Sequence, residues 1–276
     1  MKLLQLIDKY DYVLAVVVSI ATWFIGLMTT KLASYKKRKK VKKILALKKS
    51  NTDIFLPVRP GEIKLNTNVG VTVITDEFVT FHEALSIFGI ERVVQEVGGN
   101  ISEPSKMIQS NEIETSNNAF YLGGPLANHQ VARFFREFFP GVKFGCPPNS
   151  KYLNEKNRDS LFDFVFVDDS DDVGNVDFSG DMVQFGRNTE GYVILIRLMG
   201  KDDFGDCNHG TVHICFGNSA VTTRAAAKCY TAYGDELYRR LKGKHGHYFI
   251  FLKCTSEGVV NFNTFQDMTD KAFAHQ

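Results

Sequence analysis

The chain has 276 residues, of which 44% are hydrophobic, and its 23 phenylalanines supply ample material for a sizeable core. Its formal charge of +2 conceals an asymmetry, because residues 1–49 hold 12 basic and two acidic side chains. The whole chain has 33 basic and 31 acidic residues, so 21 basic and 29 acidic remain in residues 50–276, a net charge of −8. An acidic domain is poorly suited to neutralising phosphates, which excludes general nucleic-acid binding.

Residues 12–30, YVLAVVVSIATWFIGLMTT, contain no charged side chain. At a rise of about 1.5 Å per residue, a helix of this length spans roughly 28 Å, close to the hydrocarbon thickness of a bilayer. We therefore expect residues 1–30 to form a short tail and one transmembrane helix. Two alternatives are a cleaved signal peptide, which places its positive charge before the apolar segment, and a buried core helix, which usually keeps a polar face.

A run of ten cations follows the apolar segment, and no acidic residue lies between Asp11 and Asp53. The cations are Lys31, Lys36, Lys37, Arg38, Lys39, Lys40, Lys42, Lys43, Lys48 and Lys49. Basic residues beside a span are retained on the cytoplasmic side, so we expect a single-pass membrane protein with a cytosolic C-terminal domain over residues 51–276. The basic juxtamembrane segment, residues 31–50, is also expected to attract anionic lipid headgroups, which makes membrane lipid a predicted partner.

The soluble part alternates between strand-like and helix-like segments. Strands are predicted at residues 53–58, 119–122, 161–167, 192–198, 211–216 and 247–254, with an edge hairpin at 259–262. Helices are predicted at residues 76–97, 126–139 and 220–241. The first of these has Thr75-Asp76 at its cap and a break or kink at Gly89. Residues 99–117 are predicted to form a polar loop. This alternation is typical of an α/β fold with a mostly parallel sheet flanked by helices.

Five cysteines occur, Cys146, Cys207, Cys215, Cys229 and Cys254, without a C-x-x-C motif. The odd number and the apolar surroundings of three of them indicate reduced, mostly buried thiols, as in the cytosol. Cys207 lies near His209 and His213, but the spacing is irregular and a fourth ligand is not evident, so no zinc site is predicted. His213, inside an apolar strand, and His82, on a helix, are interpreted as structural residues.

Two glycine turns share one design, in which a strand runs into glycines and then into a helix. The residues expected to contact a ligand are Gly123, Gly124, Pro125, Asn128 and His129 in the first turn, and Gly217, Asn218, Ser219, Thr222 and Thr223 in the second. Glycine allows close approach to the backbone, and a helix start offers free N–H groups to an anion. The alternative is a pair of ordinary strand-to-helix turns, since neither matches G-x-G-x-x-G or a Walker loop.

An acidic run, Asp168-Asp169-Ser170-Asp171-Asp172, follows the predicted strand 161–167. Its D-x-D pattern, Asp169 and Asp171, is similar to the motif with which sugar transferases hold a divalent cation and a nucleotide-sugar diphosphate. The composition of the run equally favours a solvated acidic loop, so we assign no metal site.

Four features of the chain carry a resemblance to a known class of proteins: the single span, the basic juxtamembrane segment, and the turns at Gly123-Gly124-Pro125 and Gly217-Asn218-Ser219. With these features the chain resembles the membrane-tethered Rossmann-like nucleotide-sensor and effector proteins of prokaryotic signalling and defence systems. The resemblance implies a Rossmann-like sheet that binds a nucleotide or another anionic small ligand. Three alternatives stay open: an enzyme that cleaves an N-glycosidic or phosphate bond with Asn128, His129 or Ser219, a metal-dependent sugar transferase that uses Asp169 and Asp171, and a non-enzymatic interaction module. The sequence assigns no catalytic residue, no cofactor and no oligomeric state.

Overall fold

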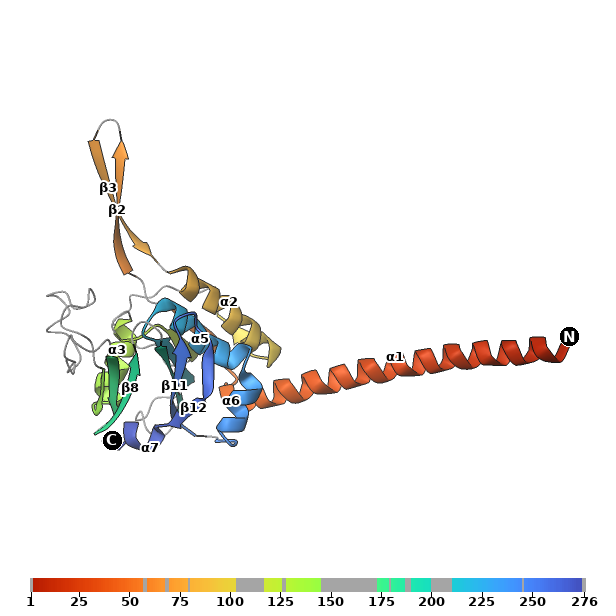
Figure 1. Ribbon diagram of the computed structural model, residues 1–276. Coiled ribbons are helices and arrows are strands. Elements are labelled where there is room, and N and C mark those ends of the chain that lie inside the picture. The colour runs from red at the N-terminus through yellow and green to blue at the C-terminus, as the bar shows by residue number, and fades with distance from the viewer. Residues whose placement is uncertain are drawn as a thin grey trace. The chain divides into compact units, whose positions relative to one another are not determined.

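The computed structural model describes residues 2–56, 59–67, 70–78, 80–102, 117–125, 128–144, 173–178, 180–186, 190–199, 210–244 and 246–274. The chain forms two compact units, Met1–Lys40 and Val41–Gln276. The first unit consists of helix, and the second is a mixed α/β unit around a seven-stranded sheet (Figure 1). The predicted fold class is therefore confirmed at the level of an α/β sheet flanked by helices.

Helix α1 (Lys2–Leu45) is unbroken and contains the whole predicted span. From Leu14 onward it is long and apolar enough to cross a membrane, and the side chains of its most apolar part are not buried against protein. Trp23, the single tryptophan of the chain, lies in this part with 61% of its surface exposed. Length and composition thus agree with the predicted apolar span.

The strand order of the main sheet is β12-β11-β9-β10-β5-β1-β4. Strands β4, β1, β5 and β10 pair in parallel, whereas β9 is antiparallel to both β10 and β11, and β12 is antiparallel to β11. Five strands therefore run in one direction and two, β9 and β12, in the other, so the sheet is mixed. The bounds are β1 Asn51–Phe55, β4 Asn100–Ile101, β5 Asn118–Leu122, β9 Glu190–Met199, β10 Thr211–Gly217, β11 Tyr248–Thr255 and β12 Val260–Asp267.

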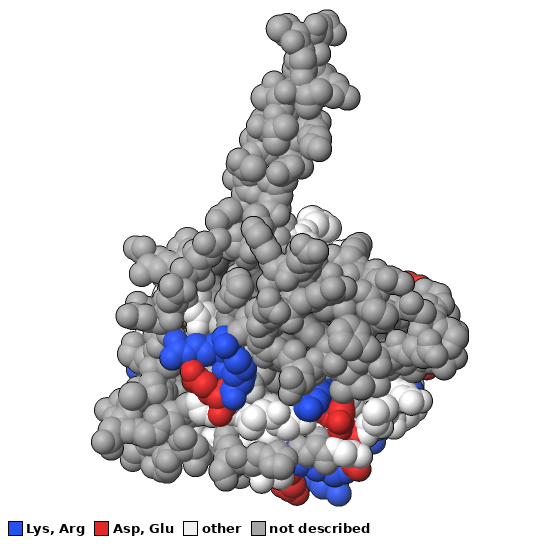
Figure 2. Space-filling model, turned by 90° about the vertical axis from the view of Figure 1, so that its left-hand side faces the viewer, with Lys and Arg blue, Asp and Glu red and all other residues white. Residues whose placement is uncertain are grey.

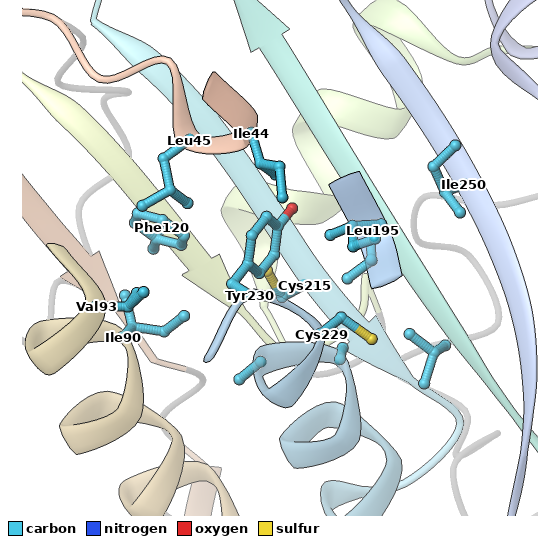
Figure 3. Packing of buried hydrophobic residues seen from close by; sticks show 14 of the residues in the cluster. Ile44, Leu45, Ile90, Val93, Phe120, Leu195, Cys215, Cys229, Tyr230 and Ile250 are labelled. Atoms are coloured by element: carbon cyan, nitrogen blue, oxygen red, sulfur yellow. The ribbon is translucent and has the colours of Figure 1, made fainter. Parts of the chain in front are cut away.

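Both faces of this sheet are covered, which explains why its central strands are continuous apolar runs. Helices α2 (Phe81–Glu96), α5 (Ala220–Thr231) and α6 (Gly234–Arg240) enclose one hydrophobic cluster, which includes Phe120, Leu195 and Cys215 (Figures 1 and 3). A second hydrophobic cluster lies on the opposite face of the sheet. It is enclosed by helix α3 (His129–Phe138), the short helix α7 (Thr269–Ala272) and a three-stranded antiparallel sheet of β6 (Val142–Phe144), β7 (Val173–Phe178) and β8 (Asp181–Gly186). Successive residues of β5 alternate between the two clusters, as a strand requires.

The region before α2 differs from the prediction. Strands β2 (Arg59–Thr67) and β3 (Gly70–Phe78) form a separate antiparallel hairpin, so the expected helix start at Asp76 is wrong. Helix α2 begins instead after Thr80, where the Glu83 backbone N–H donates to the Thr80 hydroxyl and the Thr80 N–H donates to the Glu83 carboxylate, both at 3.3 Å. This reciprocal capping box fixes the start more firmly than Thr75-Asp76 could. The helix then continues through Gly89 without a break.

The other predicted elements agree more closely with the structure. The predicted strands 119–122, 192–198, 211–216 and 247–254 correspond to β5, β9, β10 and β11, and the edge hairpin corresponds to β12 paired with β11. The single helix predicted at 220–241 is divided into α5 and α6 by Ala232 and Tyr233. The predicted strand 161–167 lies outside the described residues, and β7 and β8 were not predicted.

The last turn of α1 belongs to the core of the second unit. Val41, Ile44 and Leu45 have exposed fractions of 3%, 2% and 0% and lie in the same cluster as Phe120 and Tyr230. Figure 3 shows the Ile44 and Leu45 side chains directed into this cluster. The compact unit accordingly begins at Val41, ten residues before the domain start at residue 51 that the sequence suggested.

Replacing Leu45 with alanine should remove buried surface and leave a cavity in the core. We expect the free energy of unfolding of the full chain in mild detergent to fall by about 2–5 kcal/mol. Lys42→Ala, on the exposed side of the same turn, is the control and should change it by less than about 0.5 kcal/mol. Far-UV circular dichroism during urea titration is the measurement, and equal losses for both variants would contradict the placement of this turn in the core.

Candidate ligand-binding edge

The two predicted glycine turns lie next to one another at one edge of the main sheet. Strands β5 and β10 are parallel neighbours, with Val212 opposite Ala119 and Cys215 opposite Leu122, so both strands end at the same level. The Gly123 N–H donates to the Cys215 carbonyl oxygen at 3.1 Å, which extends the pairing of the two strands into the first turn. Turns at the carboxyl ends of adjacent parallel strands occupy the position where open α/β sheets bind ligands.

The glycines of these turns are required by the fold itself. Gly123 has a φ of +91°, a backbone conformation that side chains disfavour. A Cβ atom on Gly124 would lie 2.8 Å from the Phe216 ring, and one on Gly217 would lie 2.3 Å from the Tyr192 carbonyl oxygen. Substitution of Gly217 would therefore disturb the packing of the strand, whether or not a ligand binds beside it.

The polar side chains of the second turn hold the start of α5. Ser219 is the N-cap, and its hydroxyl accepts from the Thr222 N–H at 3.2 Å, while the Thr222 hydroxyl accepts from the Ser219 N–H at 2.8 Å. The Thr223 hydroxyl accepts from the Gly217 N–H at 3.3 Å. Thr222 and Thr223 are buried, whereas Asn218 and Ser219 are exposed. Only the exposed pair and the backbone of the turn are open to a ligand from this side.

Asn218 connects the second turn to strand β9. Its side-chain oxygen accepts from the Tyr192 N–H at 3.3 Å and from the Thr222 hydroxyl at 3.2 Å. A Cβ atom on Gly191 would lie 2.9 Å from the same oxygen, so Gly191 is needed for this approach. Sequence reasoning missed Gly191 and Tyr192 as part of the edge, although the glycine at the very start of an apolar strand, in Glu190-Gly191-Tyr192, was a usable signal.

Asn128 organises the first turn in the same way. It is the N-cap of α3, its side-chain oxygen accepts from the Gln130 N–H at 3.0 Å and the Val131 N–H at 3.3 Å, and its amide donates to the Leu122 carbonyl oxygen at 3.3 Å. With 7% exposure it is a structural cap rather than an open side chain. Pro125 is likewise buried, and the His129 side chain lies outside the described part of the chain.

Two helix N-termini give the edge its electrostatic character. Helices α3 and α5 both begin here, and each N-terminus carries a partial positive charge and backbone N–H groups that suit an anion. Nearby, Lys253 at the end of β11 pairs with Glu190 at the start of β9 at 3.2 Å, so these charges offset one another. The positive potential expected at this edge therefore comes from the helix dipoles and not from an unpaired Lys253.

Charged side chains on the described surface are mixed in sign. On the face turned to the viewer in Figure 2, basic and acidic residues lie next to one another. Arg133 pairs with Glu137 at 2.7 Å on α3, and Arg240 pairs with Glu236 at 3.0 Å on α6. Such exposed pairs contribute little to stability.

Within the described ranges, no group of three His, Cys, Asp or Glu residues is arranged to hold a metal ion. The acidic run Asp168–Asp172, Cys207 and His209 lie outside these ranges. Cys215, Cys229 and Cys254 are free and buried. Burial raises the pKa of the Cys254 thiol to about 12 and raises the pKa of Cys229 well above its usual value, so these cysteines are protonated and unreactive.

His213 is a core residue of β10, far along the strand from the glycine turn. Its Nε2 lies 2.8 Å from the Leu45 carbonyl oxygen and its Nδ1 lies 3.4 Å from the Tyr230 hydroxyl. Because the carbonyl can only accept, Nε2 carries the proton and donates. Burial, together with a smaller effect of nearby Arg197, lowers the pKa of His213 to about 3, although the hydrogen bond to Leu45 acts in the opposite direction. The ring is thus neutral at physiological pH.

Comparisons of the chain with known protein families, with curated proteins and with solved structures find no match. The interpretation of this edge accordingly rests on its geometry.

The pKa of His213 predicts a pH dependence of stability. Between pH 6.5 and 3 the unfolded chain takes up a proton on this ring that the folded chain does not, so stability falls as the pH falls through this window. From pH 7 to pH 5 the contribution of this group is about 2 kcal/mol. His213→Asn should remove it, so that the difference in unfolding free energy between parent and variant shrinks by that amount. Parallel pH profiles in urea titrations would show that His213 does not titrate in this way.

Proposed function

We propose that this protein is a membrane-anchored, Rossmann-like domain that binds a nucleotide or another anionic small molecule at the edge formed by its two glycine turns. The observation that supports this proposal is the parallel register of β5 and β10, which puts the turns that lead to α3 and α5 at the same edge of the sheet, with the two helices on its opposite faces. Two helix N-termini at one edge provide backbone N–H groups for more than one oxygen of a phosphate or diphosphate group.

The side chains of the edge favour binding over catalysis. The Ser219 hydroxyl and the Asn128 side-chain oxygen both accept hydrogen bonds in helix caps, so a catalytic role for either would compete with the cap that it forms. A role as a sensor or effector domain, in which the ligand is held rather than converted, makes no such demand. The alternative, a metal-dependent sugar transferase that uses Asp169 and Asp171, differs from this proposal in that it requires a divalent cation to bind its ligand.

Helix α1 supplies the anchor in this proposal. We place its apolar segment in the membrane once, with the domain in the cytosol, because all ten cations follow the span. Between Lys31 and Lys43 the same cations lie on exposed positions of α1, where each can contribute about 1 kcal/mol of attraction to anionic headgroups. Membrane lipid and a small anion are thus the two proposed partners.

A pair of substitutions at Ser219 tests the ligand edge without disturbing the fold. Aspartate and asparagine are both good N-caps, so Ser219→Asp and Ser219→Asn should each keep α5 capped. Only aspartate adds a negative charge at the helix start, where it competes with an anionic ligand. We expect Ser219→Asp to weaken binding at least tenfold, about 1.4 kcal/mol, and Ser219→Asn to change it less than threefold, about 0.7 kcal/mol.

The measurement is calorimetry of the full chain in nanodiscs against nucleoside mono-, di- and triphosphates and dinucleotides, with and without Mg²⁺. Product analysis of the same mixtures separates binding from turnover. Binding that requires Mg²⁺ and is equal in both Ser219 variants would place the ligand elsewhere and favour the transferase. Gly217 is avoided as a test position because its substitution would change the packing against Tyr192.

The orientation of the anchor is tested with a reporter fused after Gln276. A reporter that is active only in the cytosol should be active, and alkaline phosphatase at the same position should be inactive, because the cations retain the following chain inside. Replacing six of the lysines from Lys36 to Lys49 with glutamine should reduce this bias. An active alkaline phosphatase fusion to the unchanged chain would refute the cytosolic placement.

A further inference from the structure

The end of helix α1 is unusually well provided with hydrogen-bond donors. A helix leaves its last four carbonyl oxygens without partners in the helix, here those of Lys42, Lys43, Ile44 and Leu45. The Lys42 oxygen accepts from the Ala46 N–H at 2.9 Å. The oxygens of Lys43 and Ile44 accept from the Arg197 guanidinium at 3.1 and 2.6 Å, and that of Leu45 accepts from His213 at 2.8 Å. All four are therefore satisfied, three of them by side chains of the sheet.

The same arrangement continues into the residues after the helix. The Ala46 carbonyl oxygen accepts from the Thr211 hydroxyl at 2.7 Å. The Asn118 side chain accepts from the Lys48 N–H at 2.9 Å and donates to the Lys48 carbonyl oxygen at 3.2 Å. Strands β5, β9 and β10 thus each contribute polar side chains that bind the backbone from residue 43 to residue 48.

Arg197 is the centre of this arrangement. It is fully buried, and its Nε donates to the Gly246 oxygen at 3.0 Å, while its Nη2 donates to the oxygens of Lys244 at 3.0 Å and Gly246 at 2.5 Å. With the two bonds from Nη1 to α1, carbonyl oxygens accept from each of its three nitrogens. The guanidinium also lies over the Tyr248 ring, 4.6 Å from its centroid.

The charge of Arg197 is balanced in an unusual way. In the described part of the chain no carboxylate pairs with it, and the neighbouring His213 is neutral. A buried cation needs a compensating negative potential, and the carboxyl end of a helix supplies one through its aligned peptide dipoles. If the end of α1 left this site, the Nη1 of Arg197 would lose both of its acceptors, and the guanidinium would keep only the Lys244 and Gly246 oxygens without the helix dipole.

We propose that Arg197, His213, Thr211 and Asn118 form a latch that recognises the end of the membrane helix, so that the domain closes its core only when α1 is helical up to Leu45. These four residues are called the helix-end latch. It binds backbone groups, so it depends on the conformation of residues 43–48 and not on their side chains. The latch is a conformational device of the domain and does not depend on the proposed ligand.

Replacing Arg197 with methionine tests the latch, since methionine retains much of the volume but none of the donors. Hydrogen exchange of the full chain in nanodiscs should show backbone amides 41–50 exchanging at least about tenfold faster in Arg197→Met, while β5 and β11 stay protected. Trypsin should also cut after Lys43, Lys48 or Lys49 at least about tenfold faster, because the released segment fits a protease. Arg224→Met, on the partly exposed side of α5, is the control and should change neither.

Unchanged exchange and cleavage in Arg197→Met would overturn the proposal. If that variant unfolds as a whole, Thr211→Val decides the matter, because it removes the single donor to the Ala46 oxygen and preserves the shape of the side chain. Faster exchange confined to residues 41–50 in Thr211→Val then supports the latch. Exchange like that of the parent refutes it.

Discussion

A guanidinium that leaves water must find an acceptor for its donors and a negative potential for its charge. Arg197 finds both at one place, in the carbonyl oxygens at the end of α1 and in the loop that contains Lys244 and Gly246. Through these hydrogen bonds Arg197 connects three parts of the compact unit: the end of α1, where the unit starts, strand β9, and the residues that precede β11. Leu45 and Ile44 then complete the hydrophobic cluster on that face of the sheet.

Strand β10 connects the two polar regions of the domain. Thr211 and His213, near its amino end, hold the last residues of α1, while Gly217 at its carboxyl end begins the turn that leads into α5. Between them, Ile214, Cys215 and Phe216 are fully buried. The middle of β10 therefore packs in the hydrophobic core, and its polar contacts lie at the two ends.

Several features were predictable because they depend on local pattern. The strands at 192–198 and 211–216 are unbroken apolar runs, which is what burial on both faces of a sheet demands. The helix predicted at 126–139 corresponds to α3, which ends before Pro140-Gly141, a pair that cannot continue a helix. The direction of β9 was not predictable, because an apolar run has the same composition whichever way it points. The β2–β3 hairpin was missed because Phe78, Phe81 and Leu85 have a helical spacing that extends across the true boundary at Thr80.

The sequence predicted the two glycine turns but not the contacts that their side chains make. The sequence could indicate that glycine turns follow two strands, and the register of β5 and β10 makes those strands neighbours. It could not indicate that Asn128, Ser219 and Thr222 are occupied as helix caps, since capping and ligand binding favour the same residue types. Arg197 and His213 carried a clearer signal, because a polar residue within an apolar strand needs a buried partner. The identity of that partner, a helix end 153 residues away from Arg197 in the sequence, could not be inferred locally.

That separation along the chain has a consequence for biosynthesis. The end of α1 leaves the ribosome 153 residues before Arg197 is made, an interval of about 8–30 s at ordinary rates of translation. Contacts that close so long a loop form late in folding, after the local helices. The carbonyl oxygens of the newly made helix end are therefore hydrated first and transferred to the guanidinium only when the central sheet assembles. Helix α1 is thus synthesised before the strands whose side chains bind its last carbonyl oxygens.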